Sequence, residues 1–224
     1  ITQAVARKAW FPATLREIFP ALPGKAAPAV MGGEAETALA AAAAVPAVIK
    51  QAFVDHHKIE FLPCNDEKIL KHCKKYKITK GEIALQYIEF ITKLCENIKS
   101  FEFVAFDYGE KSNREDFSIR IYKGHKVYPF FEENLELKDF YKNSDITYDV
   151  HFDYLIDCFK ENKVKNIEFK TQLKALVDFG ILELLEILKA NVDEKTYQKE
   201  LQKVKILIQP NQLAERFKCL SVRK

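Results

Sequence analysis

Apolar and polar positions alternate after about residue 50 in a way that predicts a mixture of strands and helices. Extended structure is expected over Ala52–Leu62, with a turn around His56-His57. A helix is then expected to begin at a capping box, with Thr79 as the N-cap and Glu82 three residues later. Its apolar positions recur at helical spacing: Ile83, Tyr87, Ile91, Leu94, Cys95 and Ile98.

The best candidate for a buried strand is the hydrophobic run Phe101–Phe106, which contains no breaker. It ends at Asp107, Tyr108 and Gly109, where a carboxylate, a phenol and a flexible residue follow one another. We expect a turn there, at the carboxyl end of the strand. In open α/β sheets that edge is where ligands bind.

Two amphipathic helices are predicted further along, one over about Phe152–Lys163 and one that begins at Thr171. A more polar helix is expected from about Asp193 to Lys203. The final strand-like runs, Val204–Ile208 and Phe217–Val222, predict an antiparallel hairpin. The overall prediction is an α/β fold: a sheet with an antiparallel C-terminal hairpin and an extra helical region.

Charge and cysteine usage exclude several classes of protein. The 35 basic residues nearly balance the 32 acidic ones, which argues against a nucleic-acid partner that needs a concentrated positive surface. The basic run at residues 71–77 is interpreted as a solvated helix end. Five widely spaced cysteines without a CxxC pair favour reduced thiols and disfavour a structural zinc site. No metal is expected at His56-His57, and no membrane insertion is expected because no apolar run approaches roughly 20 residues.

Composition divides the chain near residue 50. Residues 1–50 hold 16 alanines and 3 lysines, whereas residues 51–224 hold 6 alanines and 26 lysines. A fusion, a low-complexity segment or residue identities that differ from the encoded ones would each explain the change, and we favour the last. We therefore expect two regions, residues 1–50 and residues 51–224. Peptide mass spectrometry tests this hypothesis.

From about Lys80 onward the chain resembles the MidA family of S-adenosylmethionine-dependent methyltransferases, the family of the mitochondrial complex I assembly methyltransferase. The resemblance rests on five blocks in the family's order. They read Phe103-Val104-Ala105-Phe106-Asp107-Tyr108-Gly109, Ser118-Ile119-Arg120-Ile121-Tyr122 with Gly124-His125, Asp145-Ile146-Thr147-Tyr148-Asp149-Val150-His151-Phe152, Thr171-Gln172 with Gly180-Ile181, and Pro210 with Ala214-Glu215-Arg216-Phe217-Lys218. In the third block the family's His and Asp have exchanged places at Asp149 and His151.

The resemblance implies a class I methyltransferase-like, Rossmann-like fold with S-adenosylmethionine as cofactor. It also implies that residues 1–50 are a remnant of the donor-binding half and that residues 51–224 are the remainder of the methyltransferase-like domain. The donor would be held at a glycine-rich turn, because only a backbone without side chains passes close enough to it. The candidate turn contains Gly32, Gly33 and Glu34, although the family's Gly-x-Gly pattern is not intact there. A second stretch that resembles a family motif, Glu17–Pro23, precedes this turn. In the family the corresponding motif follows the glycine-rich turn.

The candidate catalytic residues are Asp107, Tyr108 and His125. The alternative for Asp107 and Tyr108 is a turn cap and packing on the sheet, and for His125 it is packing in a surface loop. Asp145 and Thr147 are interpreted as caps of the following helix.

Two functions stay open. The first is methylation of a protein arginine, by resemblance in a subunit of respiratory complex I. The second is a catalytically inactive relative that acts as a binding or assembly factor. The expected partner is a protein substrate, a homo-oligomer is compatible with the sequence, and the expected location is the cytoplasm of a bacterium or the mitochondrial matrix of a eukaryote.

Overall fold

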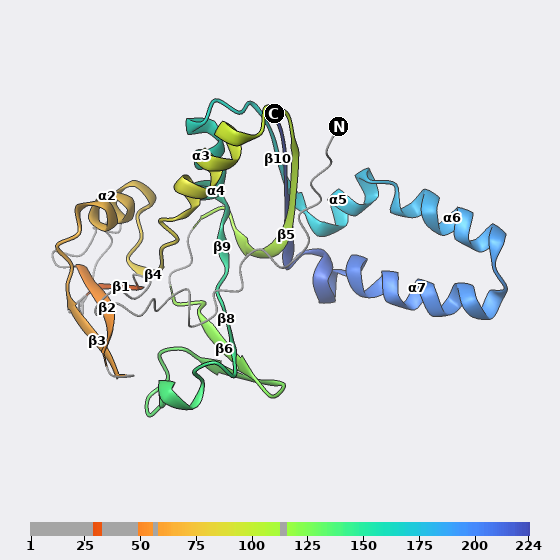
Figure 1. Cartoon of the computed structure of the whole chain (residues 1–224). Helices are drawn as coiled ribbons and strands as arrows, with labels where there is room; N and C mark the ends of the chain where they lie inside the picture. Colours follow the sequence, from red (N-terminus) through yellow and green to blue (C-terminus); the bar gives the residue numbers. More distant parts are fainter. Residues whose placement is uncertain (1–28, 33–48, 56–57, 113–115) are drawn as a thin grey trace, which may run out of the picture. The chain divides into compact units, whose positions relative to one another are not determined.

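The computed structural model describes residues 29–32, 49–55, 58–112 and 116–224 (Figure 1). The chain divides into two compact units. Unit 1 contains Thr92–Gly109 and Ile156–Lys224, and unit 2 contains Glu110–Leu155 and the described residues before Thr92. None of the described helices is long and apolar enough to cross a membrane.

The first sheet of unit 2 is antiparallel throughout, with the strand order β3-β2-β1-β4. The pairing of β2 with β3 confirms the expected extended structure on both sides of His56-His57, which lie outside the described residues. Beside these strands is one helix, whose N-cap Asp66 accepts a 2.8 Å hydrogen bond from the amide of Lys68. The elements are β1 (Ala29–Gly32), β2 (Ile49–Asp55), β3 (Lys58–Pro63), β4 (Lys80–Glu82) and α2 (Glu67–Tyr76).

A second antiparallel sheet in unit 2 has the order β7-β6-β8. Its strands surround a small apolar core that includes the fully buried Ile121 and Ile146. Gly124 and His125 form the tight turn between β6 and β7, both with positive φ. The elements are β6 (Arg120–Lys123), β7 (Lys126–Pro129), a 3-10 turn (Leu137–Asp139) and β8 (Asp145–Thr147). The short strand β9 (Val150–His151) follows β8 in the chain and is not part of this sheet.

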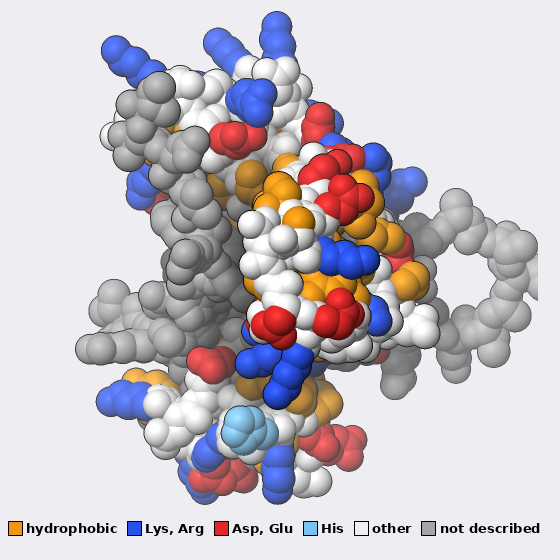
Figure 2. All heavy atoms as spheres, turned by 90° about the vertical axis from the view of Figure 1, so that its right-hand side faces the viewer, with side chains coloured by type: hydrophobic (Ala, Val, Ile, Leu, Met, Phe, Trp, Pro, Cys, Tyr) orange, Lys and Arg blue, Asp and Glu red, His pale blue; other side chains and the backbone are white. Residues whose placement is uncertain are grey.

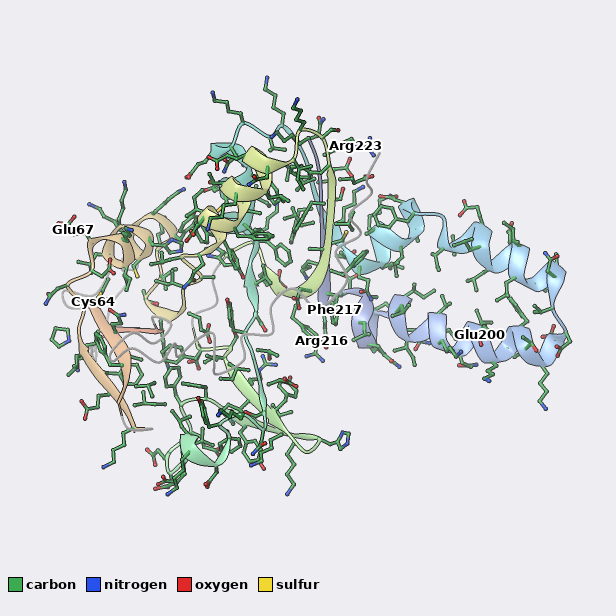
Figure 3. All side chains as sticks on the ribbon, in the orientation of Figure 1. Cys64, Glu67, Glu200, Arg216, Phe217 and Arg223 are labelled. Carbon is green, nitrogen blue, oxygen red and sulfur yellow. The ribbon has the colours of Figure 1, made fainter. Side chains whose placement is uncertain are left out.

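In unit 1 the last strand of the chain, β11 (Phe217–Arg223), lies between β5 (Glu102–Glu110) and β10 (Asn166–Thr171). It runs antiparallel to both, so β5 and β10 run parallel to each other. Figure 3 labels Phe217 and Arg223 at the two ends of β11; Arg223 pairs with Glu102 of β5 at 2.9 Å. The C-terminal antiparallel strand of the prediction is therefore present.

Two helices extend into unit 1, α3 (Tyr87–Asn97) and α4 (Phe152–Glu161). Within this unit the side chain of Asn162, just after α4, donates a 3.1 Å hydrogen bond to the hydroxyl of Thr92 in α3. The prediction of a helix over Phe152–Lys163 is confirmed, and α3 buries the expected positions Tyr87, Ile91 and Cys95.

Three further helices form the extra helical region: α5 (Gln172–Asp178), α6 (Ile181–Asn191) and α7 (Glu194–Ile208). We call α6 and α7 together the helical arm. Figure 1 shows the arm as an antiparallel hairpin that extends away from the sheet of unit 1. Figure 2 turns the arm toward the reader and shows hydrophobic side chains on its surface.

Three local predictions are wrong. Thr79 and Glu82 do not open a helix, because Glu82 ends β4 and its carboxylate binds the amides of a distant loop. Asp145 and Thr147 belong to strand β8 and cap no helix. Val204–Ile208 continues α7, because Val204 and Ile208 extend the half-buried helical face begun by Tyr197 and Leu201; the partner of the last strand is β10.

Two other predictions need new boundaries. The helix that begins at Thr171 stops at Phe179 and restarts after Gly180, whose φ of 84° lies in the left-handed region that glycine adopts without strain. The strand predicted to end at Phe106 continues to Glu110, so Asp107-Tyr108-Gly109 lies inside β5 and is not a turn. That strand is half-buried along most of its length, not fully buried.

Candidate functional site

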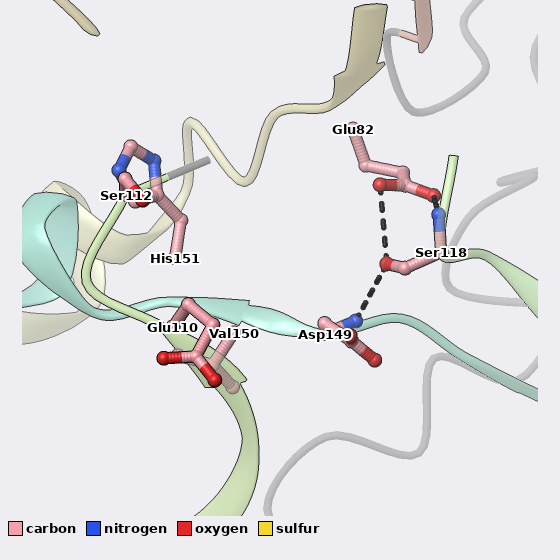
Figure 4. A pocket seen from close by; sticks show the side chains of 7 residues that line it. All are labelled: Glu82, Glu110, Ser112, Ser118, Asp149, Val150 and His151. Carbon is pink, nitrogen blue, oxygen red and sulfur yellow. Dashed lines mark hydrogen bonds between the residues drawn. The ribbon is translucent and has the colours of Figure 1, made fainter. Parts of the chain in front are cut away.

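An open hollow of about 240 Å³ in unit 2 is the candidate functional site (Figure 4). Three carboxylic acids, a histidine and two serines face it, so the lining is acidic and rich in hydrogen-bonding groups. It is assembled from the end of β4, the segment after β5, the loop before β6 and the start of β9. The lining residues are Glu82, Glu110, Ser112, Ser118, Asp149, Val150 and His151.

One wall of the hollow is fixed by a hydrogen-bond network around Glu82 and Ser118. The Glu82 carboxylate accepts a 2.6 Å bond from the amide of Ser118, another from the amide of Ile119 and a 3.2 Å bond from the Ser118 hydroxyl. The Ser118 hydroxyl accepts a 2.8 Å bond from the amide of Asp149. Burial raises the pKa of Glu82, and the hydrogen bonds from Ile119 and Ser118 act in the opposite direction. The network ties β4, the loop before β6 and the approach to β9 to one carboxylate.

The carboxylate of Asp149 lies beside a guanidinium. Its Oδ1 is 3.6 Å from a terminal nitrogen of Arg120, and both side chains are partly exposed. The two residues come together because β6 and β8 pair with Arg120 opposite Thr147, two residues before Asp149. At this distance the contact is an ion pair without a short hydrogen bond. A cationic ligand would compete with Arg120 for the same carboxylate.

Behind His151 lies a cluster of aromatic rings. Its ring is 4.8 Å from that of Tyr76, and the His72 ring stands edge-on to Tyr154 at 4.4 Å. The Tyr154 hydroxyl donates a 3.1 Å hydrogen bond to the carbonyl of Leu85. These contacts hold one face of His151 against an apolar wall, which limits how its ring can turn.

His72 lies at the centre of this cluster and is 8% exposed. In the described part of the chain its Nε2 is buried without a hydrogen-bond partner. Burial, then the charges of His151 and Lys75, lowers the pKa of His72 to about 4. The ring is therefore neutral near pH 7, and it serves packing.

The predicted catalytic residues do not line the hollow. Asp107 and Tyr108 are adjacent in β5 of unit 1, where the Asp107 carboxylate accepts a 2.8 Å bond from the Tyr108 amide. The Tyr108 ring packs 4.0 Å from that of Phe217 and 5.4 Å from the Arg216 guanidinium. His125 is exposed in the turn between β6 and β7 of unit 2.

The predicted cofactor residues fall at the edge of the described chain. Gly32 is the last residue of β1, while Gly33 and Glu34 lie outside the described residues. β1 runs antiparallel to β2 and β4. The glycine-rich turn of dinucleotide-binding sheets follows a parallel strand instead.

The clustering of Glu82, Glu110 and Ser118 was missed from the sequence. Asp149 and His151 carried a signal, because they are the positions at which the His and Asp of the third MidA block have exchanged places. Both departures lie in the hollow. In the described part of the chain no group of three or more His, Cys, Asp and Glu residues is arranged to hold a metal ion.

The fold is similar to that of solved structures from Burkholderia thailandensis. One is a native structure of "an uncharacterized ACR, COG1565 superfamily protein", with 17% identity and a TM-score of 0.60, covering 79% of this chain and 49% of that one. Another is a COG1565 superfamily member and "likely methyl transferase" bound to S-adenosyl-homocysteine, with 16% identity and a TM-score of 0.61, covering 79% of this chain and 47% of that one.

These similarities confirm the predicted α/β, class I methyltransferase-like architecture. The chain spans about half the length of either structure. No family model matches the chain, and no curated protein matches its sequence.

Proposed function

We propose that the protein is an S-adenosylmethionine-dependent methyltransferase. The observation that carries the proposal is the likeness of fold, over 79% of the chain, to a COG1565 structure bound to S-adenosyl-homocysteine. S-adenosyl-homocysteine is what remains of the donor once its methyl group has been transferred. A neighbour of the same fold that binds this product supports a donor of the same kind here.

The hollow suits an acceptor side chain better than a whole donor. The hollow is open, and its roughly 240 Å³ includes open solvent, so it does not enclose a whole small molecule in the way that a typical ligand pocket does. Gly32, Gly33 and Glu34 remain the sequence-based candidates for donor binding, and no catalytic step is derived through the donor.

The acceptor that fits the hollow best is an arginine of a protein. Carboxylates bind a planar guanidinium through charge-assisted hydrogen bonds, and among the carboxylates of the hollow Glu110 is exposed and Asp149 is partly exposed. The ion pair between Asp149 and Arg120 supports the choice, because it places a guanidinium of the protein itself on this carboxylate.

Catalysis by such a site is mainly alignment together with removal of one proton. The bound donor would supply a methyl group on a positively charged sulfur, which makes a good leaving group. Asp149 would orient the guanidinium, and the exposed Glu110 would accept the proton that leaves the attacking nitrogen. Asp107, Tyr108 and His125 remain the sequence-based candidates for a catalytic role.

The finer parts of the proposal follow the sequence resemblance. The substrate would be a subunit of respiratory complex I, and the protein would act in the bacterial cytoplasm or, in a eukaryote, in the mitochondrial matrix. The competing function is a non-catalytic binding or assembly factor.

The experiment is transfer of labelled methyl from S-adenosylmethionine to an arginine peptide, with the same peptide carrying neutral citrulline as the control. We expect label in the arginine peptide alone, and a loss of at least tenfold in rate for Glu110→Gln. Glu133→Gln, also exposed in unit 2 but outside the hollow, is the matched control. Absence of transfer by folded protein to any arginine peptide or subunit would favour the binding factor.

A further inference from the structure

The helical arm leaves an unusual amount of apolar surface uncovered. Ten large hydrophobic residues of the described chain are exposed; five of them lie in α6 or α7, and a sixth, Phe179, lies just before α6. Neither α6 nor α7 has a single buried residue, although both are helices of more than ten residues. The six are Phe179, Leu182, Leu184, Ile187, Ile206 and Leu207, which are 37–60% exposed.

The apolar surface of α6 is wider than a two-helix hairpin needs. Ile181, Leu185 and Leu188 are half-buried and form the stripe that faces α7. Leu184 and Ile187 lie three residues apart, on the flank beside that stripe, and are 58% and 60% exposed. A helix that is apolar on its inner face and on one flank is typical of a bundle with more than two helices.

The charges beside this flank differ in sign between the two helices. On α6, Glu183 lies one helical turn before Ile187; on α7, Lys203 lies one turn before Leu207. Lys203 bonds to Glu200 of its own helix at 2.7 Å. Because this ion pair is exposed, replacing it by a pair with another carboxylate costs little free energy. The surface of α6 with Ile187 and the Glu183 carboxylate is therefore complementary in charge to the surface of α7 with Leu207 and the Lys203 ammonium group.

We propose that the arm is the interface between two copies of this chain, with α6 of one copy against α7 of the other in a four-helix bundle. In a two-fold interface both copies use the same surface, so each copy has to carry both complementary helices. The arm does so, since it carries the acidic apolar helix and the basic apolar helix side by side. The interface requires no donor or acceptor, so it is independent of the proposed methyl transfer.

Sedimentation velocity of the full chain, without any ligand, tests the proposal. The wild type should sediment as a dimer at about 10 μM, and Leu184→Glu/Ile187→Glu should raise the dissociation constant at least about 100-fold, because two apolar side chains leave the interface. Val127→Glu replaces a residue that is 50% exposed on β7 of unit 2 and should leave the dimer intact. Circular dichroism confirms that each variant is folded.

A charge exchange decides whether the partner is a second copy. Glu183→Lys alone and Lys203→Glu alone should each weaken the dimer about tenfold, because like charges then meet across the interface twice. The two substitutions in one chain should restore it, and an equimolar mixture of the two single variants should form a mixed dimer. A monomeric wild type at 100 μM, or a doubly substituted chain no tighter than the single variants, would overturn the proposal.

Discussion

The amide of Ser118 donates a 2.6 Å hydrogen bond to the carboxylate of Glu82, which lies 36 residues earlier in the chain. With the bonds from Ile119 and from the Ser118 hydroxyl, it makes one carboxylate the anchor of a wall of the hollow. Ser118 is buried, so these donors have no access to bulk water when the carboxylate is removed.

Glu82→Gln should therefore lower the free energy of unfolding by about 1–3 kcal/mol, since the amide group of glutamine can satisfy fewer of the three donors. Urea denaturation at pH 7 measures the change. Glu110→Gln, at an exposed residue of the same hollow, should stay within about 0.5 kcal/mol of the wild type. If Glu82→Gln and Glu110→Gln lowered the free energy of unfolding equally, the hydrogen bonds around Glu82 would not contribute specifically to stability.

His72 should make stability depend on pH in a defined window. Its pKa is lowered from 6.5 to about 4 by burial and by the charges of His151 and Lys75. As the pH falls, His72 therefore binds a proton in the unfolded chain before it does so in the folded chain. The contribution of His72 to stability is complete above about pH 6.5 and is lost between pH 6.5 and 4, by at most about 3 kcal/mol.

The variant His72→Phe, which has a similar volume, should remove this part of the pH dependence. Urea denaturation between pH 4.5 and 7.5 gives the two profiles. Parallel profiles for wild type and His72→Phe would refute the assignment.

Asp149 and Arg120 should have opposite effects on an arginine acceptor. Asp149→Asn removes the charge that holds the guanidinium and should raise KM about 10- to 100-fold, as expected for a lost charge-assisted hydrogen bond. Arg120→Gln removes one cation that competes for the Asp149 carboxylate and should lower KM. Steady-state methyl transfer to an arginine peptide measures both, and a shift of KM in the same direction for the two variants would count against competition for Asp149.

Local patterns predicted much of the fold. The amphipathic spacing placed α3, α4 and α7, and Asp193 caps α7 through a 3.0 Å bond from the amide of Thr196. The errors arose where two patterns overlapped. Residues 204–208 are rich in β-branched side chains and look like a strand, yet they also continue a helical face, and packing within the arm favours the helix.

The candidate site was less predictable, because it depends on contacts between distant segments. Glu82 was expected to cap a helix, and no local pattern indicates that its partner would be Ser118. Asp107 and Tyr108 were chosen because a strand was expected to end there, whereas β5 continues past them. Only Asp149 and His151 could have been selected in advance, as the positions where a family block is altered.

Isothermal titration of the full chain with S-adenosyl-homocysteine tests the central claim most directly. The account predicts saturable binding with one site per chain, and a Gly33→Val variant with the same circular dichroism spectrum should bind at least tenfold more weakly. No heat at millimolar ligand, from a folded full-length sample, would contradict a donor site and leave the protein as a binding or assembly factor with a methyltransferase-like fold.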